Sequence, residues 1–227
     1  MPAKKKLAIC PHCGHEQQEP PAAYSTLCRG CGQHFRLQET TPLVGPVTPP
    51  QDLRSVHCFQ CGTELDVPIS AQSTMCKRCS SHVDLMDYTV SGTVSKNFKT
   101  KGRFVVEPSG YLLNSETTAW DVILKGRVIG TLRAENVLEL HASANIKGQF
   151  SAGHLIILPR SRFNFPELTT ATVTEVLGEL VVERCVADRV ILRAGARFFG
   201  KIEANEVLVE SGAVVVGHLR VGKMRKR

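Results

Sequence analysis

The sequence predicts an all-β chain in which two small tetracysteine modules precede a β-solenoid (β-helix) of about six coils, which we expect to be right-handed. Two observations lead to this fold class. Eight of the nine cysteines form one spacing pattern that occurs twice. Further along the chain, short runs rich in Val, Ile and Leu recur every 17 or 18 residues without the 3.6-residue period of a helix.

The cysteine pattern is CxxC, a 14-residue gap and a second CxxC, and its second copy lies 48 residues after the first. A CxxC pair lies on one tight turn, and two such turns place four sulfurs at the corners of a tetrahedron. This is the closed geometry of structural Zn²⁺, which leaves no coordination position for catalysis. The sequence therefore predicts two zinc ions, one bound by Cys10, Cys13, Cys28 and Cys31 and the other by Cys58, Cys61, Cys76 and Cys79.

The repeat extends beyond the cysteines, and the two modules resemble zinc ribbons over residues 7–40 and 55–88. Glycine after a CxxC pair suits a turn with positive φ, although the second module has Ser80 at one such place. Among the histidines near the cysteines, the matched pair His34 and His82 are the best candidates to donate hydrogen bonds to thiolates. Identical residues 48 positions apart are Gly14 and Gly62, Glu16 and Glu64, Pro20 and Pro68, Ala23 and Ala71, Ser25 and Ser73, Thr26 and Thr74, His34 and His82, and Leu37 and Leu85.

Disulfide-linked modules of a secreted chain are the alternative interpretation of these cysteines. The N-terminal MPAKKKLAIC has no apolar stretch of the length that a signal peptide needs. We therefore expect a cytoplasmic protein with reduced, metal-binding thiols, either free or peripheral at the inner face of the membrane. No apolar run approaches the roughly 18 residues that cross a bilayer.

The formal charge of +7 overstates the case for nucleic-acid binding. Residues 1–90 contain equal numbers of acidic and basic residues, and each site of four thiolates with one Zn²⁺ carries a charge of −2. Two loaded sites would lower the charge of the chain from +7 to +3. Basic residues cluster at Lys4, Lys5 and Lys6 and in the tail 223–227, where they could contact phosphates or anionic lipid.

A Pro-rich linker is expected over residues 41–54 and a second linker over 89–103, followed by the solenoid over 104–222. Three columns of small or apolar residues keep one register. They are Leu132, Phe150, Leu168, Cys185, Ile202 and Leu219; Ala134, Ala152, Thr170, Ala187, Ala204 and Val221; and Val137, Leu155, Val173, Val190 and Val207. Corners precede the first column at Gly130, Gly148, Pro166, Glu183, Gly200 and Gly217. A β-sandwich would not require this shared register.

The solenoid offers no catalytic constellation, so we expect no enzyme and no small-molecule substrate. The coils lack the regular six-residue unit of hexapeptide acyltransferases, and Glu135, Glu139, Glu179 and Glu203 are scattered among arginines. His141, His154 and His218 do not align with one another or with a Ser or Asp that could complete a nucleophilic site. Cys185, in the first column, is expected to be a small buried hydrophobic residue.

The repeating Gly, aliphatic and Ala pattern resembles the bactofilins, a polymer-forming bacterial cytoskeletal family, over about residues 98–222. The residues that match are Gly126, Gly130, Ala134, Gly148, Ala152, Gly200, Ala204, Gly212 and Gly217. Pro166 and Glu183 depart from the pattern, the coil over 166–182 is the least regular, and residues 104–120 lose the register, so that the first coil is expected to be a cap. The resemblance implies filaments that form without nucleotide.

After the apolar residues Val214 to Val216, Leu219 and Val221, little sequence remains to cover the last coil, so we expect it to pair with another copy. The resulting hypothesis is a self-polymerising scaffold whose zinc ribbons bind an unidentified protein partner. The alternative is a zinc-ribbon nucleic-acid-binding protein that its β-helix oligomerises.

Overall fold

A computed structural model describes residues 5–37, 52–169 and 172–222 and divides the chain into two compact units, Met1–Pro50 and Gln51–Arg227. All regular structure in the described ranges is β-strand, which confirms the all-β fold class. Among these residues, no helix is long and apolar enough to cross a membrane. Most of the expected 41–54 linker, the tail 223–227 and Thr170 lie outside the described residues.

The first unit contains two antiparallel hairpins. In the first hairpin, Lys6 pairs with Glu19 and Ile9 with Glu16; in the second, Ser25 pairs with Arg36. One CxxC pair lies in the turn between the two strands of each hairpin, and the hairpins share a core that holds Cys10 and Cys28 with Ala8 and Phe35. The strands are β1 (Lys6–Ile9), β2 (Glu16–Glu19), β3 (Ser25–Leu27) and β4 (His34–Arg36).

The second unit begins with the same pair of hairpins. We call this module ribbon 2 and the module of the first unit ribbon 1. Alternating buried positions of β5, β6 and β8 build its core from Val56, Leu65, Val67 and Val83 around Cys58 and Cys76. The strands are β5 (Leu53–His57), β6 (Glu64–Pro68), β7 (Ser73–Met75) and β8 (His82–Asp84).

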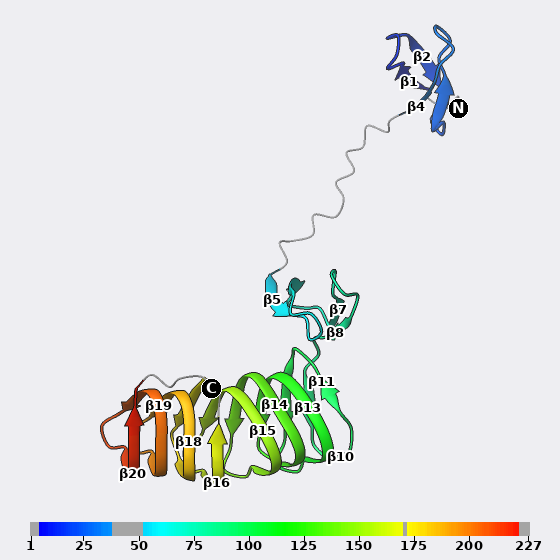
Figure 1. The fold of residues 1–227 in the computed structure, drawn as a ribbon. Coiled ribbons are helices and arrows are strands. Elements are labelled where there is room, and N and C mark those ends of the chain that lie inside the picture. Colours follow the sequence, from blue (N-terminus) through cyan, green and yellow to red (C-terminus); the bar gives the residue numbers. More distant parts are fainter. Residues whose placement is uncertain (1–4, 38–51, 170–171, 223–227) are drawn as a thin grey trace. The chain divides into compact units, whose positions relative to one another are not determined.

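Beyond ribbon 2 the chain winds into a parallel β-solenoid of about eight turns, two more than expected (Figure 1). The extra turns lie at its N-terminal end, because β9, β10 and β11 occupy the expected linker 89–103 and pair with β12 and β13. The strands are β9 (Tyr88–Val90), β10 (Thr93–Val94), β11 (Phe98–Lys99), β12 (Arg103–Val106), β13 (Tyr111–Leu124), β14 (Arg127–Leu140), β15 (Asn145–Ile157), β16 (Arg162–Thr169), β17 (Val173–Val176), β18 (Glu179–Leu192), β19 (Arg197–Val209) and β20 (Val214–Val221).

The first predicted column is an interior column of the stack. Leu132 pairs with Phe150, and Cys185 lies between Leu168 and Ile202. The third column was predicted one residue out of register at two places. An irregularity after Ala134 makes Leu138, not Val137, the partner of Leu155, and Thr174 lies where Val173 was expected. Leu138 and Thr174 are fully buried, which shows that they face the core.

Residues 104–120 form a regular coil, not the expected cap. Asn114, with φ of 46°, is an extra residue between two paired positions, and it displaces the sequence register of β13. Thr117 pairs with Leu132 and is fully buried, whereas Glu116 points to solvent. The register of the predicted columns is therefore lost here, because a β-bulge adds a residue without adding a core position.

Glycine corners stack on one another in two pairs, Gly130 with Gly148 and Gly200 with Gly217. All four have φ between 131° and 141°, a conformation that side chains resist. A β-carbon at Gly148 would lie 2.1 Å from the Gly130 carbonyl oxygen. The prediction that Glu183 is a corner was wrong. Glu183 is skipped in the strand pairing, and Val182 lies opposite Gly200.

The stack is irregular between β15 and β16, near Pro166, as the sequence predicted. In the described residues, Asn145–Ala152 pairs only with β14, and β16 pairs only with β18. On the adjoining face the ladder continues, because His154–Ile157 pairs with β17. Aromatic rings pack at the interruption, with Phe150 and Phe163 each next to Phe165 at centroid distances of 5.1 and 5.8 Å.

Candidate metal centres and the ends of the solenoid

Each predicted cysteine set forms one compact cluster, in which all four sulfurs lie within 4.8 Å of one another. In ribbon 1, Cys10 and Cys31 are 3.8 Å apart and Cys13 and Cys28 are 3.5 Å apart. The corresponding sulfur distances in ribbon 2 are 3.6 Å for Cys58 and Cys79 and 3.5 Å for Cys61 and Cys76.

These distances fit a tetrahedral metal. Four sulfurs at about 2.3 Å from a central Zn²⁺ would be separated by about 3.8 Å. A disulfide requires a sulfur distance of about 2.05 Å, so the clusters do not have disulfide geometry. The residues therefore fit four-thiolate coordination of a soft or borderline metal ion.

Four tight turns produce this arrangement. After the first cysteine of each pair, a backbone N–H four residues later donates to its carbonyl, as from Gly14 to Cys10 and from Gly62 to Cys58. Gly14, Gly32 and Gly62 have φ near 70°. Ser80 has φ of 56°, so the turn without glycine adopts the same left-handed conformation.

Hydroxyl groups, and not the candidate histidines, lie next to the sulfurs of ribbon 2. Thr63 Oγ1 is 3.2 Å from Cys61 Sγ, and Ser81 Oγ is 3.2 Å from Cys79 Sγ. The hydroxyl and N–H of Thr63 lower the pKa of Cys61 to about 6, and those of Ser81 lower the pKa of Cys79, because they stabilise a thiolate. His34 and His82 are exposed and make none of these sulfur contacts.

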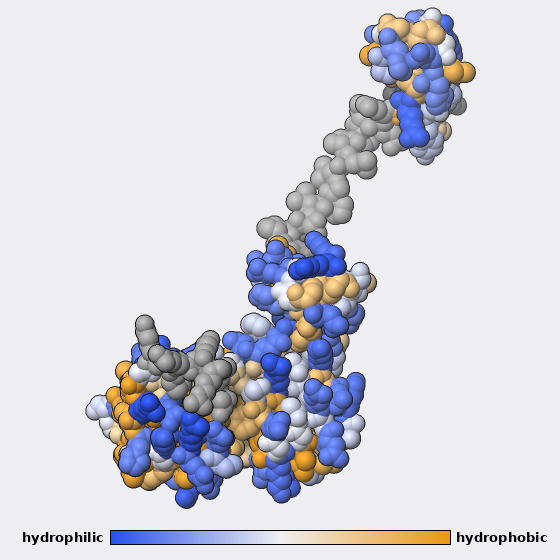
Figure 2. Space-filling view, viewed as in Figure 1, coloured by the Kyte–Doolittle hydropathy of each residue, from blue (hydrophilic) through white to orange (hydrophobic). Residues whose placement is uncertain are grey.

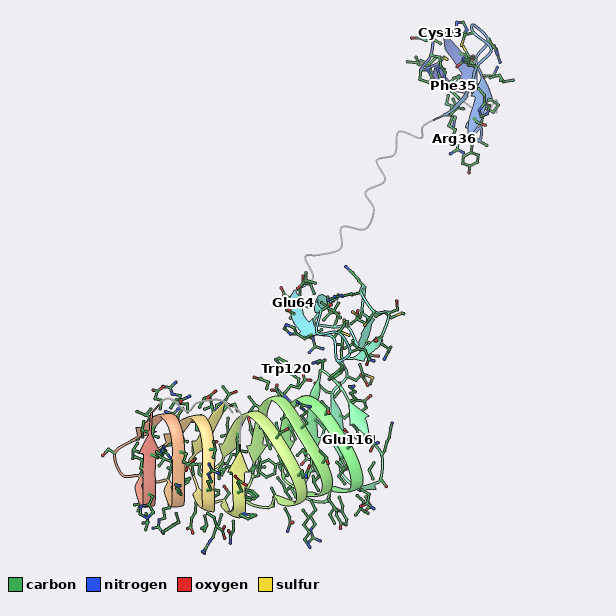
Figure 3. All side chains as sticks on the ribbon, viewed as in Figure 1. Cys13, Phe35, Arg36, Glu64, Glu116 and Trp120 are labelled. Atoms are coloured by element: carbon green, nitrogen blue, oxygen red, sulfur yellow. The ribbon has the colours of Figure 1, made fainter. Side chains whose placement is uncertain are left out.

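Ribbon 2 is joined to the first coils of the solenoid by a buried lysine. The side chain of Lys101 is 3% exposed and forms an ion pair with Glu135. Its Nζ also lies 4.1 Å from the ring centre of Phe59, which follows Cys58, and 5.8 Å from that of Trp120. Figure 3 shows Trp120 where the solenoid meets ribbon 2. Beside this junction is a cavity of about 310 Å³ lined by Cys58, Phe59, Gln60, Ser81, His82, Asp84 and Lys99.

The scattered carboxylates of the solenoid are paired with cations in neighbouring coils. Glu203 contacts Arg184 of the preceding coil at 2.7 Å and Lys201 of its own strand at 2.7 Å, and these two cations lower its pKa to about 2. Arg193 lies between Glu175 and Glu210, at 2.5 and 2.6 Å. These groups act as ladders between coils, and they do not converge with a nucleophile in a pocket.

Cys185 is fully buried in the solenoid core, as predicted. Its burial raises the pKa of the thiol to about 12, although a hydrogen bond with Thr174 acts in the opposite direction. The thiol is therefore inaccessible to solvent, and it belongs to neither cysteine cluster.

The two ends of the solenoid differ. At the N-terminal end, Val90 is only 4% exposed, and Tyr88 and Phe98 pack against the same core with their ring centres 5.3 Å apart. At the other end, β20 pairs only with β19 among the described residues, and Leu219, stacked on the fully buried Ile202, is 52% exposed. Figure 2 shows apolar surface at this end, to which Val209, Leu219 and Val221 contribute; each of them stacks on a fully buried residue of the coil before.

Fold and site together define an all-β protein with two tetracysteine modules followed by a β-solenoid whose last described coil exposes apolar residues. A family model described as bactofilin, polymer-forming cytoskeletal, matches residues 79–165. The chain is thus bactofilin-like over a segment that runs from the last cysteine of ribbon 2 into β16. Matching residues that we identified beyond it, such as Gly200 and Gly217, share the solenoid register but lie outside the match. No curated protein and no solved structure matches the chain.

Proposed function

We propose that this protein is a non-enzymatic scaffold that assembles by end-to-end stacking of its solenoid. The observation that carries the proposal is the exposure of Leu219, the last residue of an interior column. Leu219 is half exposed, whereas the three preceding residues of the column, Leu168, Cys185 and Ile202, are buried. A further coil would bury this layer and pair the free edge of β20. The family model's description as polymer-forming supports the same reading.

We also propose that the clusters bind Zn²⁺ and that ribbon 1 serves as a docking module for a protein partner. Ribbon 1 forms a compact unit of its own and exposes Leu7, Ile9, Tyr24 and Leu27. Ribbon 2 has Ser55, His57, Gln72 and Met75 at the positions 48 residues later, so only Met75 keeps the apolar character. Thiolate coordination requires reduced cysteines, which is consistent with a cytoplasmic location.

Negative-stain electron microscopy of the purified, metal-loaded full chain without nucleotide tests the scaffold proposal. We expect filaments with the width of one solenoid. Particles that stay monomeric at high protein concentration, with two metal ions bound, would refute assembly while leaving the metal sites intact.

A further inference from the structure

The duplicated module has diverged at the positions where ribbon 2 contacts the solenoid. Phe59 of ribbon 2 corresponds to Pro11 of ribbon 1, and Asp84 corresponds to Arg36. The ring of Phe59 lies against Lys101 and Lys99, at 4.1 and 4.8 Å from their Nζ atoms. A proline cannot supply that aromatic face, and an arginine cannot accept hydrogen bonds as the Asp84 carboxylate does.

Asp84 holds the first coil of the solenoid. Its carboxylate accepts hydrogen bonds from the Tyr88 hydroxyl at 2.6 Å and from the Met86 N–H at 2.9 Å. Its carbonyl accepts the N–H of Lys101 at 2.8 Å. Tyr88 in turn packs on Phe98, so that the rings covering the N-terminal end of the stack are fixed by a residue of ribbon 2.

The corner at Thr100–Gly102 is also built on the chain that leaves ribbon 2. The Thr100 hydroxyl donates to the Met86 carbonyl at 2.7 Å, and the Arg103 N–H donates to Asp87 at 2.6 Å. A β-carbon at Gly102 would lie 2.3 Å from the Met86 carbonyl oxygen, which shows how closely the two segments approach. Thr100 is fully buried in this contact.

We propose that the metal site of ribbon 2 holds the first coil of the solenoid in place, whereas the metal site of ribbon 1 has no such role. A four-thiolate ribbon depends on its metal for folding. Phe59 follows the ligand Cys58, and Asp84 ends β8 in the hairpin that contains Cys76 and Cys79, so both contacts require the folded knuckles. Loss of metal from ribbon 2 therefore loosens β9 to β11 and uncovers the N-terminal end of the stack.

The inference rests on the proposed metal binding and not on filament assembly. Hydrogen exchange of the full chain, read on peptides from 88–106 with peptides from 190–209 as an internal reference, tests it. We expect Cys76→Ser to raise exchange over 88–106 by on the order of tenfold or more, and the matched variant Cys28→Ser in ribbon 1 to leave it unchanged. Equal exchange in the two variants would overturn the inference.

Phe59→Ala provides a test that keeps all eight ligands. We expect two metal ions per chain, as in the parent, with faster exchange over 88–106; Pro11→Ala, the equivalent change in ribbon 1, should alter neither quantity. Unchanged exchange in Phe59→Ala with both metals bound would overturn the coupling, even if Cys76→Ser unfolds more of the chain. Filament assembly is read separately by microscopy, so its failure would not be mistaken for failure of this coupling.

Discussion

Gly217 lies over Gly200 so closely that a β-carbon at position 217 would be 1.8 Å from the Gly200 carbonyl oxygen. The two residues have φ of 141° and 134°. The corner thus requires glycine twice over, once for the backbone conformation and once for the space between coils. Because a solenoid coil is stable only when its neighbours cover it, damage at one corner should spread to the adjoining coils.

Gly200→Ala should therefore lower the free energy of unfolding of the solenoid by about 3 kcal/mol or more, since strain and overlap add. Its β-carbon would lie 1.6 Å from the Val182 carbonyl oxygen. Urea unfolding followed by circular dichroism measures the change. Gly92→Ala is the control, because no atom lies within 4 Å of its β-carbon position; similar losses in both variants would contradict the corner argument.

Acid should weaken the Glu203 ladder in a defined pH range. The carboxyl has a pKa of about 2 in the folded chain against an ordinary value of 4.5, so the folded state favours the ionised form. Its contribution is present above pH 4.5 and is lost as the pH falls through about 2. The difference in urea midpoint between the parent and Glu203→Gln should therefore shrink over this range.

Comparison of the two chains at each pH removes the common effect of metal loss from the ribbons. Glu116→Gln, an exposed residue without an ion pair in the described structure, should differ little from the parent at any pH. A Glu203→Gln difference that stays constant from pH 7 to pH 2 would be inconsistent with the ladder.

The ninth cysteine should behave unlike the other eight. After chelation of the metal, an alkylating reagent should label the eight ribbon thiols and spare Cys185 until the solenoid unfolds, because this thiol is fully buried and its pKa is about 12. Mass spectrometry of the folded and the denatured chain counts the labels. Rapid labelling of Cys185 in the folded chain would mean that the core around it is open.

Metal analysis should give two Zn²⁺ per chain and one in either Cys10→Ser or Cys58→Ser. Structural zinc contributes about 10 to 16 kcal/mol to folding of a small module, so loss of one thiolate should unfold that module. Cys185→Ala should keep two ions. A parent chain that binds fewer than two, or a Cys10→Ser chain that still binds two, would contradict one ion per cluster.

The cysteine clusters could be predicted from spacing because a CxxC pair and its turn are local. The structure brings the cysteines together in two clusters of four, as expected. The solenoid columns were predictable wherever coil length is constant, as from Leu168 to Leu219. Bulges break that rule, which is why residues 104–120 lost the predicted register and Val137 was predicted in place of Leu138. The first coil escaped detection because β9, β10 and β11 have only two or three residues each.

The junction between ribbon 2 and the solenoid was missed for a different reason. Phe59, Lys101 and Glu135 are far apart in the sequence, and no local pattern links a residue of a knuckle to residues of two coils. The one available signal was Phe59 itself, an aromatic residue between the two cysteines of a CxxC pair where the first copy has Pro11.

Sedimentation velocity of the metal-loaded full chain carrying Leu219→Arg or Val216→Arg tests end-to-end stacking most directly. Both parent side chains are 52% exposed on β20, but Leu219 stacks on the buried Ile202, whereas Val216 stacks on Phe199 of the outer face. We predict that Leu219→Arg is monomeric, because its charge would be buried in the next coil, and that Val216→Arg assembles like the parent. Assembly of Leu219→Arg to the same extent as Val216→Arg would contradict stacking through this end.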